Sequence, residues 1–275
     1  MQEIKNITKN LEGLTPEEST QLVELERSVA LEEARPNITK NFLSFVKYVW
    51  PEFIEGSHHK IINKKFNDIA EGKIKRLIVN MPPRHTKSEF ASYLLPAWMI
   101  GKSPSLKIIQ ATHTADLAID FGRKTKNLVD DTKYQELFKT RLQEDSQAAG
   151  KWKTEQGGEY FAAGVGGAIT GRGADLLIID DPHKEQDFRA DGKAFEKAMT
   201  WYTAGPRQRL QPGGSIVIVM TRWSTKDITG QLLKAQSEEG SDQWEVVELP
   251  ALLPDGKPVW PEYWSAEELL KTTAS

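Results

Sequence analysis

The chain has 275 residues, of which 39% are hydrophobic, so it is long enough for one large α/β domain or two small ones with a packed core. It contains no cysteine, which excludes a disulfide framework and any cysteine-ligated zinc or iron–sulfur site. The net charge of -3 does not indicate a strongly basic nucleic-acid-binding protein. The polar start MQEIKNITKN and the lack of a long apolar run in the sequence predict a cytosolic protein without a membrane span.

Helical signals dominate the first part of the chain. Thr15, followed by Pro16 and Glu18, forms the capping-box pattern of a helix start, and this helix is expected to end before Pro36. Two further stretches have apolar residues at helical spacing. The three helices are expected over residues 15–35, 39–50 and 57–72.

Short apolar runs alternate with helical patterns in the rest of the chain. The expected strands cover residues 77–79, 106–110, 176–179 and 216–219. The helical patterns between them cover residues 88–99, 115–129 and 188–201. Such alternation is typical of an α/β fold, in which a mostly parallel β-sheet is flanked by helices on both faces.

The loop after the first expected strand, MPPRHTKS, ends in the Lys-Ser pair that closes a phosphate-binding loop. The usual pattern G-x-x-x-x-G-K-[ST] would require glycine at Met81 and Thr86. Phosphate binding itself needs backbone N–H groups at a helix N-terminus and a cation, and glycine only eases close approach. Because residues 82 and 83 are prolines, the N–H groups of residues 84–88 would have to hold the phosphate. The alternative is an ordinary strand-to-helix turn with a solvated lysine.

The third expected strand ends in Asp180 and Asp181, and an acidic residue at such a strand end is where a P-loop NTPase holds its magnesium ion. The two motifs together predict that Lys87 reaches the β and γ phosphates of ATP and that Ser88 and Asp180 bind Mg2+. The alternative is a strand end that caps the next helix. At least one expected strand separates the motifs in sequence, which favours the P-loop class with an additional strand between its two signature strands.

Three other residues of the loop are expected to influence phosphate binding. Arg84 and His85 can add positive charge near the γ phosphate of ATP. Thr86, at the usual glycine position, implies a slightly different loop conformation. Residues 84–88 together are therefore the predicted cofactor-binding part of the loop.

Four segments in order resemble a known family: NMPPRHTKSEFAS, GRGADLLIIDDPHK, MTRWSTKDITGQLL and LPALLPDGKPVWPEYWSAEELL. They are similar to the ATPase domain of the large terminase subunit of tailed double-stranded DNA bacteriophages, over roughly residues 50–270. In that family the loop most often reads P-P-R-H-G-K-S, so Thr86 is a departure. The resemblance implies an additional-strand (ASCE/RecA-like) P-loop NTPase core over residues 51–250. It also implies an N-terminal helical segment (1–50) and a C-terminal lid or linker (251–275) leading towards an absent nuclease domain.

The resemblance also implies roles for residues at two strand ends. Asp181 follows the magnesium aspartate where many members have the glutamate that orients the attacking water, and Glu185 is the alternative for this role. The segment MTRW resembles the coupling motif. Thr221 and Arg222 would then sense the γ phosphate and transmit hydrolysis to the rest of the domain, whereas the alternative for Arg222 is a surface cation.

Two further roles are left open between alternatives. Arg172 precedes the metal-binding strand and is the candidate for an arginine finger that acts on a neighbouring subunit, while Arg84 could act within its own subunit instead. Terminases place an adenine-recognition element before the loop strand, where this chain has His58 and His59. Either histidine would contact adenine, or both are exposed residues at a helix N-terminus.

The function implied by the resemblance is an ATP-hydrolysing motor that translocates double-stranded DNA into the procapsid. Its implied cofactors are ATP and Mg2+. Its implied partners are the portal protein, the small terminase subunit and copies of itself in a homo-oligomeric ring, a pentamer when assembled on the portal, with no membrane partner. It would work in the cytoplasm of the infected bacterial host, and no nuclease activity is expected from this chain.

Two other functions remain as alternatives. The missing glycines allow a non-hydrolysing nucleotide-binding assembly protein, which measured ATP turnover would distinguish from a motor. A helicase-like DNA translocase would need a second nucleotide-binding lobe, and the residues after Met220 are too few for it and wrong in pattern.

Overall fold

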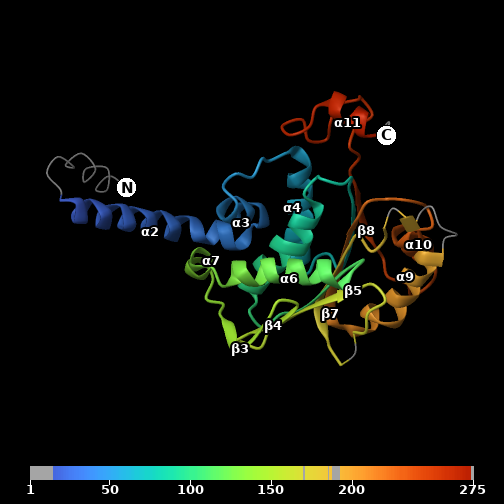
Figure 1. Cartoon of the computed structure of the whole chain (residues 1–275), viewed down its shortest axis with the longest axis horizontal. Helices are drawn as coiled ribbons and strands as arrows, with labels where there is room; N and C mark the ends of the chain where they lie inside the picture. Colours follow the sequence, from blue (N-terminus) through green and yellow to red (C-terminus); the bar gives the residue numbers. More distant parts are fainter. Residues whose placement is uncertain (1–14, 170, 185, 188–192, 274–275) are drawn as a thin grey trace.

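The computed structural model of the chain describes residues 15–169, 171–184, 186–187 and 193–273. Its centre is one eight-stranded sheet with helices around it (Figure 1). The strands are β1 (Arg76–Asn80), β2 (Lys107–Thr112), β3 (Leu142–Ala148), β4 (Lys151–Thr154), β5 (Glu159–Gly164), β6 (Ala174–Asp180), β7 (Leu210–Met220) and β8 (Glu245–Glu248). The helices are α2 (Pro16–Lys40), α3 (Phe42–Val49), α4 (Ser57–Ala70), α5 (Leu95–Lys102), α6 (Ala115–Val129), α7 (Thr132–Leu137), α9 (Lys193–Ala204), α10 (Ile228–Ala235) and α11 (Ala266–Thr273), with the π-helix η2 (Glu89–Leu94) and the 3-10 helix η3 (Pro206–Arg209).

The strand order is β3-β4-β5-β2-β6-β7-β1-β8. All pairs from β5 to β8 in this order are parallel, and β3 and β4 extend the sheet in antiparallel fashion. The four expected strands are confirmed as β1, β2, β6 and β7, whereas β3, β4, β5 and β8 were not predicted. Because β7 lies between β1 and β6, the fold is that of a P-loop NTPase with an additional strand, as predicted.

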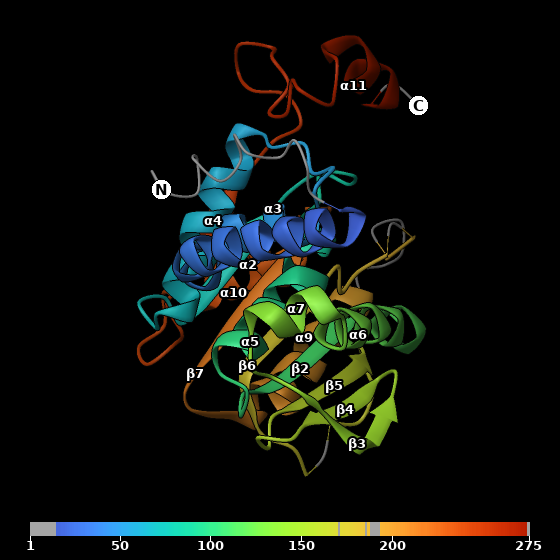
Figure 2. The same ribbon diagram turned by 90° about the vertical axis from the view of Figure 1, so that its left-hand side faces the viewer.

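The sheet has an apolar core on each face because its central strands alternate their side chains between the two faces. Leu77 and Val79 of β1 pack in the core beneath α3, α4 and α5, while Ile78 packs in the other core, beneath α9 and α10. The α11 helix stands apart from the sheet, beyond α4 (Figures 1 and 2). In the described ranges, no helix is long and apolar enough to cross a membrane.

The first helix differs from its prediction at one end. Its capping box is present, since the Thr15 side chain accepts from the N–H of residue 18, but the helix continues for a further turn past Pro36. Tertiary contacts compensate for the hydrogen bond that proline removes, because Ile38 is buried in the core and the Thr39 carbonyl accepts from Trp98 Nε1 at 3.1 Å. The next helix therefore begins after Asn41, not at residue 39.

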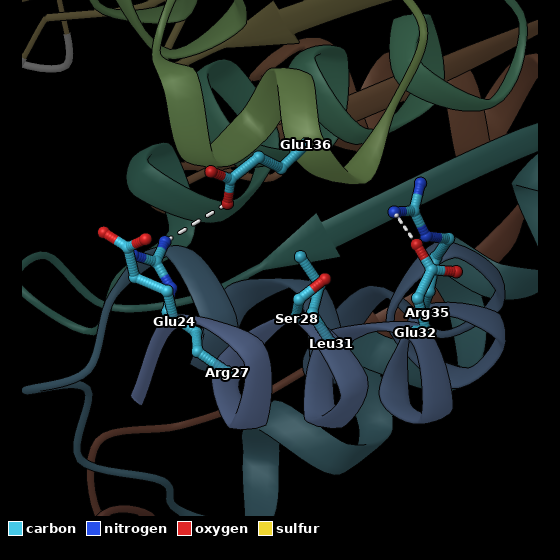
Figure 3. A pocket seen from close by; sticks show the side chains of 7 residues that line it. All are labelled: Glu24, Arg27, Ser28, Leu31, Glu32, Arg35 and Glu136. Atoms are coloured by element: carbon cyan, nitrogen blue, oxygen red, sulfur yellow. Dashed lines mark hydrogen bonds and ion pairs between the residues drawn. The ribbon is translucent and has the colours of Figure 1, made fainter. Parts of the chain in front are cut away.

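A shallow polar groove of about 380 Å3 lies between α2 and α7 (Figure 3). Arg27 of α2 and Glu136 of α7 form an ion pair across it at 3.2 Å, with 60% and 40% of their side chains exposed. A pair this exposed contributes at most about 1 kcal/mol to stability. The groove shares no lining residue with the strand ends described next.

Candidate nucleotide-binding site

The predicted phosphate loop connects the carboxyl end of β1 to a helical segment that begins at Lys87 and continues as η2. Met81, the first residue after β1, still bonds to the end of the neighbouring strand β7, because its N–H donates to the Met220 carbonyl at 3.0 Å. The N–H groups of residues 84–88, in contrast, donate to no acceptor among the described residues. A row of free N–H groups at a helix start is the feature that binds anions.

Two residues of the loop adopt left-handed backbone torsions. Arg84 has φ of 60° and Thr86 has φ of 65°. Thr86 is β-branched, and a left-handed torsion costs an L-residue about 1–2 kcal/mol. The torsion that glycine usually supplies at this position is therefore present at Thr86 itself, and neighbouring contacts must hold it there.

Lys87 and Asp181 form an ion pair that joins the two predicted motifs. Their Nζ and Oδ2 atoms lie 2.8 Å apart, and only 7% of the lysine side chain is exposed. Asp181 has φ of 40°, and its carboxylate accepts from the Thr221 N–H at 2.8 Å. The structure thus brings together the loop lysine, the carboxylate predicted to orient water and the start of the predicted coupling motif.

Asp180, the predicted metal ligand, is a buried carboxylate held by two hydroxyl groups. Ser88 Oγ donates to Oδ1 at 3.0 Å and Ser92 Oγ donates to Oδ2 at 2.7 Å. Gln110 of β2 donates in turn to Ser92 at 2.8 Å. Burial, together with the charge of Asp181, raises the pKa of Asp180 to about 7, so a nearby cation would stabilise its ionised form.

Ser92 and Gln110 were missed by the sequence analysis. The signal for Ser92 was its position four residues after Ser88, on the same side of a helix. Nothing in the sequence indicated Gln110, because its contact depends on how β2 packs beside β6.

The residues present fit a magnesium ion. Ser88 and Asp180 offer a hydroxyl and a carboxylate oxygen, which are hard ligands of the kind that Mg2+ prefers. No cluster of three or more histidine, aspartate or glutamate side chains suited to a metal occurs in the part of the chain that the structure describes. Mg2+ usually takes one or two protein carboxylates and completes its shell with water and substrate phosphates, so this small donor set is sufficient.

The two expected positive charges of the loop have different surroundings. Arg84 is exposed and makes no ion pair among the described residues. His85 is 1% exposed, donates from Nδ1 to the Pro83 carbonyl at 2.8 Å and stacks on Trp264 with ring centroids 6.1 Å apart. Burial lowers the pKa of His85, so its ring is neutral near pH 7. A positive charge on His85 beside a bound γ phosphate, which would favour the protonated ring, stays a prediction.

His58 and His59 are both fully buried, which excludes the prediction that they are exposed. His59 Nδ1 accepts from the Gly56 N–H at 2.8 Å, and its Nε2 lies 2.8 Å from Thr86 Oγ1. A cavity of about 160 Å3 adjoins the loop. Aromatic side chains line it together with two residues of the loop: Trp50, Phe53, Trp260, Tyr263, Arg84 and Thr86. Contact of either histidine with adenine stays a prediction.

The predicted coupling motif continues into an ion-pair network. Arg222 Nε lies 3.0 Å from the buried Asp227, and Arg222 Nη1 lies 3.0 Å from Glu248. Asp227 caps the N-terminus of α10 by accepting from the Gly230 N–H. Arg222 is therefore not a free surface cation, and its role in sensing the γ phosphate stays a prediction. Glu185, the alternative water-orienting residue, lies outside the described residues.

Arg172 is not brought to the loop within the same chain. It precedes β6, so it lies at the amino ends of the parallel strands, whereas the loop follows the carboxyl end of β1. Its guanidinium group pairs with Glu159 and lies 4.1 Å from the centroid of the Phe161 ring. Any action of Arg172 on a nucleotide would thus require a neighbouring subunit, and this role stays a prediction.

Comparisons with known proteins found a likeness to solved structures. No protein-family model matches the chain, and no curated protein matches it. The crystal structure of the HK97 bacteriophage large terminase is similar to it, with a TM-score of 0.49 and 13% sequence identity. The match covers 77% of this chain and 46% of that chain, so this chain spans about half the length of that protein.

Proposed function

We propose that this chain is the ATP-hydrolysing motor domain of a phage DNA-packaging terminase. The observation that carries the proposal is the meeting of two motifs at the carboxyl edge of the sheet. There, the free N–H groups of residues 84–88 lie in the same site as Lys87, Ser88 and Asp180. The carboxyl ends of the strands are where open α/β sheets bind their ligands.

Each residue of the site has a task in phosphate binding. The N–H groups of residues 84–88 would hold the phosphate oxygens, and Lys87 would neutralise the β and γ phosphates. Ser88 and Asp180 would hold Mg2+, which would neutralise the negative charge that develops on the phosphates. The raised pKa of Asp180 means that full ionisation of this ligand needs a neighbouring positive charge.

The ion pair between Lys87 and Asp181 indicates how binding and hydrolysis are linked. A lysine that turns towards phosphate gives up its contact with Asp181. The freed carboxylate can then accept a hydrogen bond from the attacking water, while the Thr221 N–H holds its other oxygen in place. Nucleotide binding would thus release the residue that catalysis requires.

The DNA-packaging part of the proposal rests on the four terminase-like segments of the sequence. Double-stranded DNA, the portal protein and the small terminase subunit are the proposed partners, and the host cytoplasm is the proposed location. Arg172 lies at the amino ends of the parallel strands, whereas the loop of its own chain lies at their carboxyl ends. This position is consistent with a ring in which neighbouring copies complete each site.

Magnesium-dependent ATP turnover, followed by phosphate release with and without linear double-stranded DNA, tests the proposal. Turnover should increase with DNA and rise more steeply than linearly with protein concentration. Asp180→Asn should abolish it. The matched control is Asp175→Asn at the opposite end of β6, where the carboxylate accepts from the Lys107 N–H. Turnover that is absent in the wild-type chain, despite nucleotide binding and assembly, would instead support the non-hydrolysing assembly protein.

A further inference from the structure

The left-handed torsion of Thr86 is accompanied by a chain of hydrogen bonds that begins outside the loop. The Gly56 N–H donates to His59 Nδ1 at 2.8 Å. Because Nδ1 is an acceptor, the ring hydrogen of neutral His59 lies on Nε2, which is 2.8 Å from Thr86 Oγ1. The Thr86 hydroxyl donates onward to the His85 carbonyl at 2.6 Å. The direction of each hydrogen bond is therefore fixed, from the Gly56 N–H before α4 to the His85 carbonyl in the loop.

Packing fixes the orientation of the His59 ring. The ring is fully buried, and its centroid lies 4.7 Å from that of Phe53, 5.0 Å from that of Phe90 and 5.0 Å from that of Trp260. Phe90 belongs to η2, directly after the loop. Burial, followed by the neighbouring His58 and His85, lowers the pKa of His59 to about 3, so the ring stays neutral near pH 7. The donor that faces Thr86 is thus held in place.

We infer that His59 is a positioning residue for the phosphate loop, and that it takes over the task that glycine performs at position 86 in the usual motif. Glycine adopts a left-handed torsion without strain, whereas threonine needs a contact to hold it. The Thr86 hydroxyl supplies that contact by accepting from His59 and donating to the His85 carbonyl. His59 thereby keeps the N–H groups of residues 84–88 available for phosphate. The inference rests on the proposed function, since it assumes that these groups bind a nucleotide.

The inference predicts that His59 and Thr86 depend on one another. His59→Asn keeps an acceptor for the Gly56 N–H but is too short to reach Thr86, whereas His59→Gln places an amide N–H near the position of Nε2. In the wild-type background, His59→Asn should weaken Mg-ATP binding about 10-fold, the size expected for the loss of one side-chain hydrogen bond. His59→Gln should recover most of that loss.

The decisive test is His59→Asn in a chain that also carries Thr86→Gly. In the Thr86→Gly background, His59→Asn should change Mg-ATP affinity less than about 2-fold, because glycine needs no contact to hold the torsion. Calorimetric titration of four chains measures this difference: wild type, His59→Asn, Thr86→Gly and the double variant. Equal losses in both backgrounds would show that His59 only supports the fold, and no loss in either would also overturn the inference.

A second pair of variants guards against misfolding of the His59 variants. Thr86→Val keeps the branched shape and removes the hydroxyl, whereas Thr86→Ser keeps the hydroxyl. Thr86→Val should reproduce the loss of affinity caused by His59→Asn, and Thr86→Ser should show a smaller loss. The opposite order would contradict the inference, because side-chain shape and not the hydroxyl would then control the loop.

Failure of the proposed function can be distinguished from failure of this inference. If wild-type chain binds no Mg-ATP, the proposed function fails. The same four chains are then compared by urea unfolding, and 15N NMR of the wild-type chain reports the tautomer of His59. An energetic coupling between positions 59 and 86 and a proton on Nε2 would support the hydrogen-bond chain. A proton on Nδ1, or additive effects of the two substitutions, would overturn it.

Discussion

The two edges of the parallel sheet, at the amino and carboxyl ends of its strands, differ in how many of their polar groups have a partner. At the amino edge, Arg207 forms two hydrogen bonds to Asp242, at 2.6 Å and 3.0 Å, and Arg76 Nε lies 2.9 Å from the same carboxylate. Arg172 and Glu159 are paired there as well. At the carboxyl edge, five successive N–H groups have no acceptor among the described residues.

The carboxyl edge also concentrates backbone strain and a buried acid. Arg84, Thr86 and Asp181 have positive φ, and the carboxyl group of Asp180 is buried. No other non-glycine residue in the described ranges has a positive φ. Strain and unsatisfied groups persist where function requires them, whereas paired charges serve stability. Substitutions at the carboxyl edge should therefore affect nucleotide chemistry, and those at the amino edge should affect stability.

Arg172 is the proposed exception to this division, and it carries the largest expected effect. An arginine supplied in trans contributes about 10³ to 10⁵ in rate in P-loop enzymes. Arg172→Ala should therefore reduce the turnover of assembled protein by at least about 10³-fold, as measured by phosphate release. Mixing it with excess Asp181→Asn chain, which keeps its arginine, should restore turnover that neither chain has alone.

Two outcomes would overturn the role of Arg172. One is wild-type turnover in Arg172→Ala. The other is mixed assemblies that form, as shown by co-purification of differently tagged chains, without any recovery of turnover. Arg84, which is exposed on the loop, would then be the better candidate, and Arg84→Ala is the parallel variant.

The next largest effect is expected at Asp181. Asp181→Asn should lower ATP turnover by about 10² to 10⁴, because the amide cannot accept the proton of the attacking water. Mg-ATP affinity should be retained or raised, since the contact with the attacking water is realised only in the transition state and the variant weakens the contact with Lys87 that phosphate binding would break. Phosphate release and calorimetry measure the two quantities. Near-normal turnover, combined with a loss in Glu185→Gln, would transfer the role to Glu185.

Buried neutral histidines give a smaller effect that depends on pH. Burial lowers the pKa of His59 to about 3, below its usual value of 6.5, so the folded state binds fewer protons than the unfolded state as the pH falls through 6.5. The contribution of neutral His59 to the free energy of unfolding is therefore fully present above pH 6.5, and about 2 kcal/mol of it is lost by pH 5. Urea unfolding at pH 8 and pH 5 should show that His59→Gln removes about this much of the pH dependence.

Comparing the wild-type chain with His59→Gln isolates the contribution of His59 to the pH dependence of stability. Asp180, whose raised pKa acts in the opposite direction, is present in both chains, so its contribution cancels. An identical pH dependence in the wild-type chain and His59→Gln would contradict the neutral, buried state of this ring.

The smallest effect is expected at the amino edge. Arg207 and Asp242 are 35% and 22% exposed, so solvent screening limits their pair to about 1 kcal/mol or less. Arg207→Ala should lower the free energy of urea unfolding by no more than this and leave Mg-ATP affinity unchanged. A clear loss of affinity would show that the two edges are not functionally separate.

The sequence predicted the elements whose local pattern is strong. The runs 77–79 and 176–179 are buried on both faces and read as central strands, and their ends carried the two motifs of the site. Strand β3, with the sequence LQEDSQA, is the outermost strand on one side of the sheet and has no apolar run, so no sequence signal marked it. The helix that continues past Pro36 and the contact of His59 with Thr86 depend on tertiary packing between segments that the sequence does not place together.

Calorimetric titration of Mg-ATP into the wild-type chain and into Lys87→Ala tests the central claim most directly. Lys87 is the cation of the proposed phosphate site, whereas Lys133 is an exposed lysine of α7 and serves as the matched control in Lys133→Ala. We expect Lys87→Ala to lose at least about 100-fold in affinity, as for a buried charge-assisted contact, with circular dichroism unchanged and Lys133→Ala binding like wild type. Unchanged affinity in folded Lys87→Ala would contradict the assignment of the loop as a phosphate site.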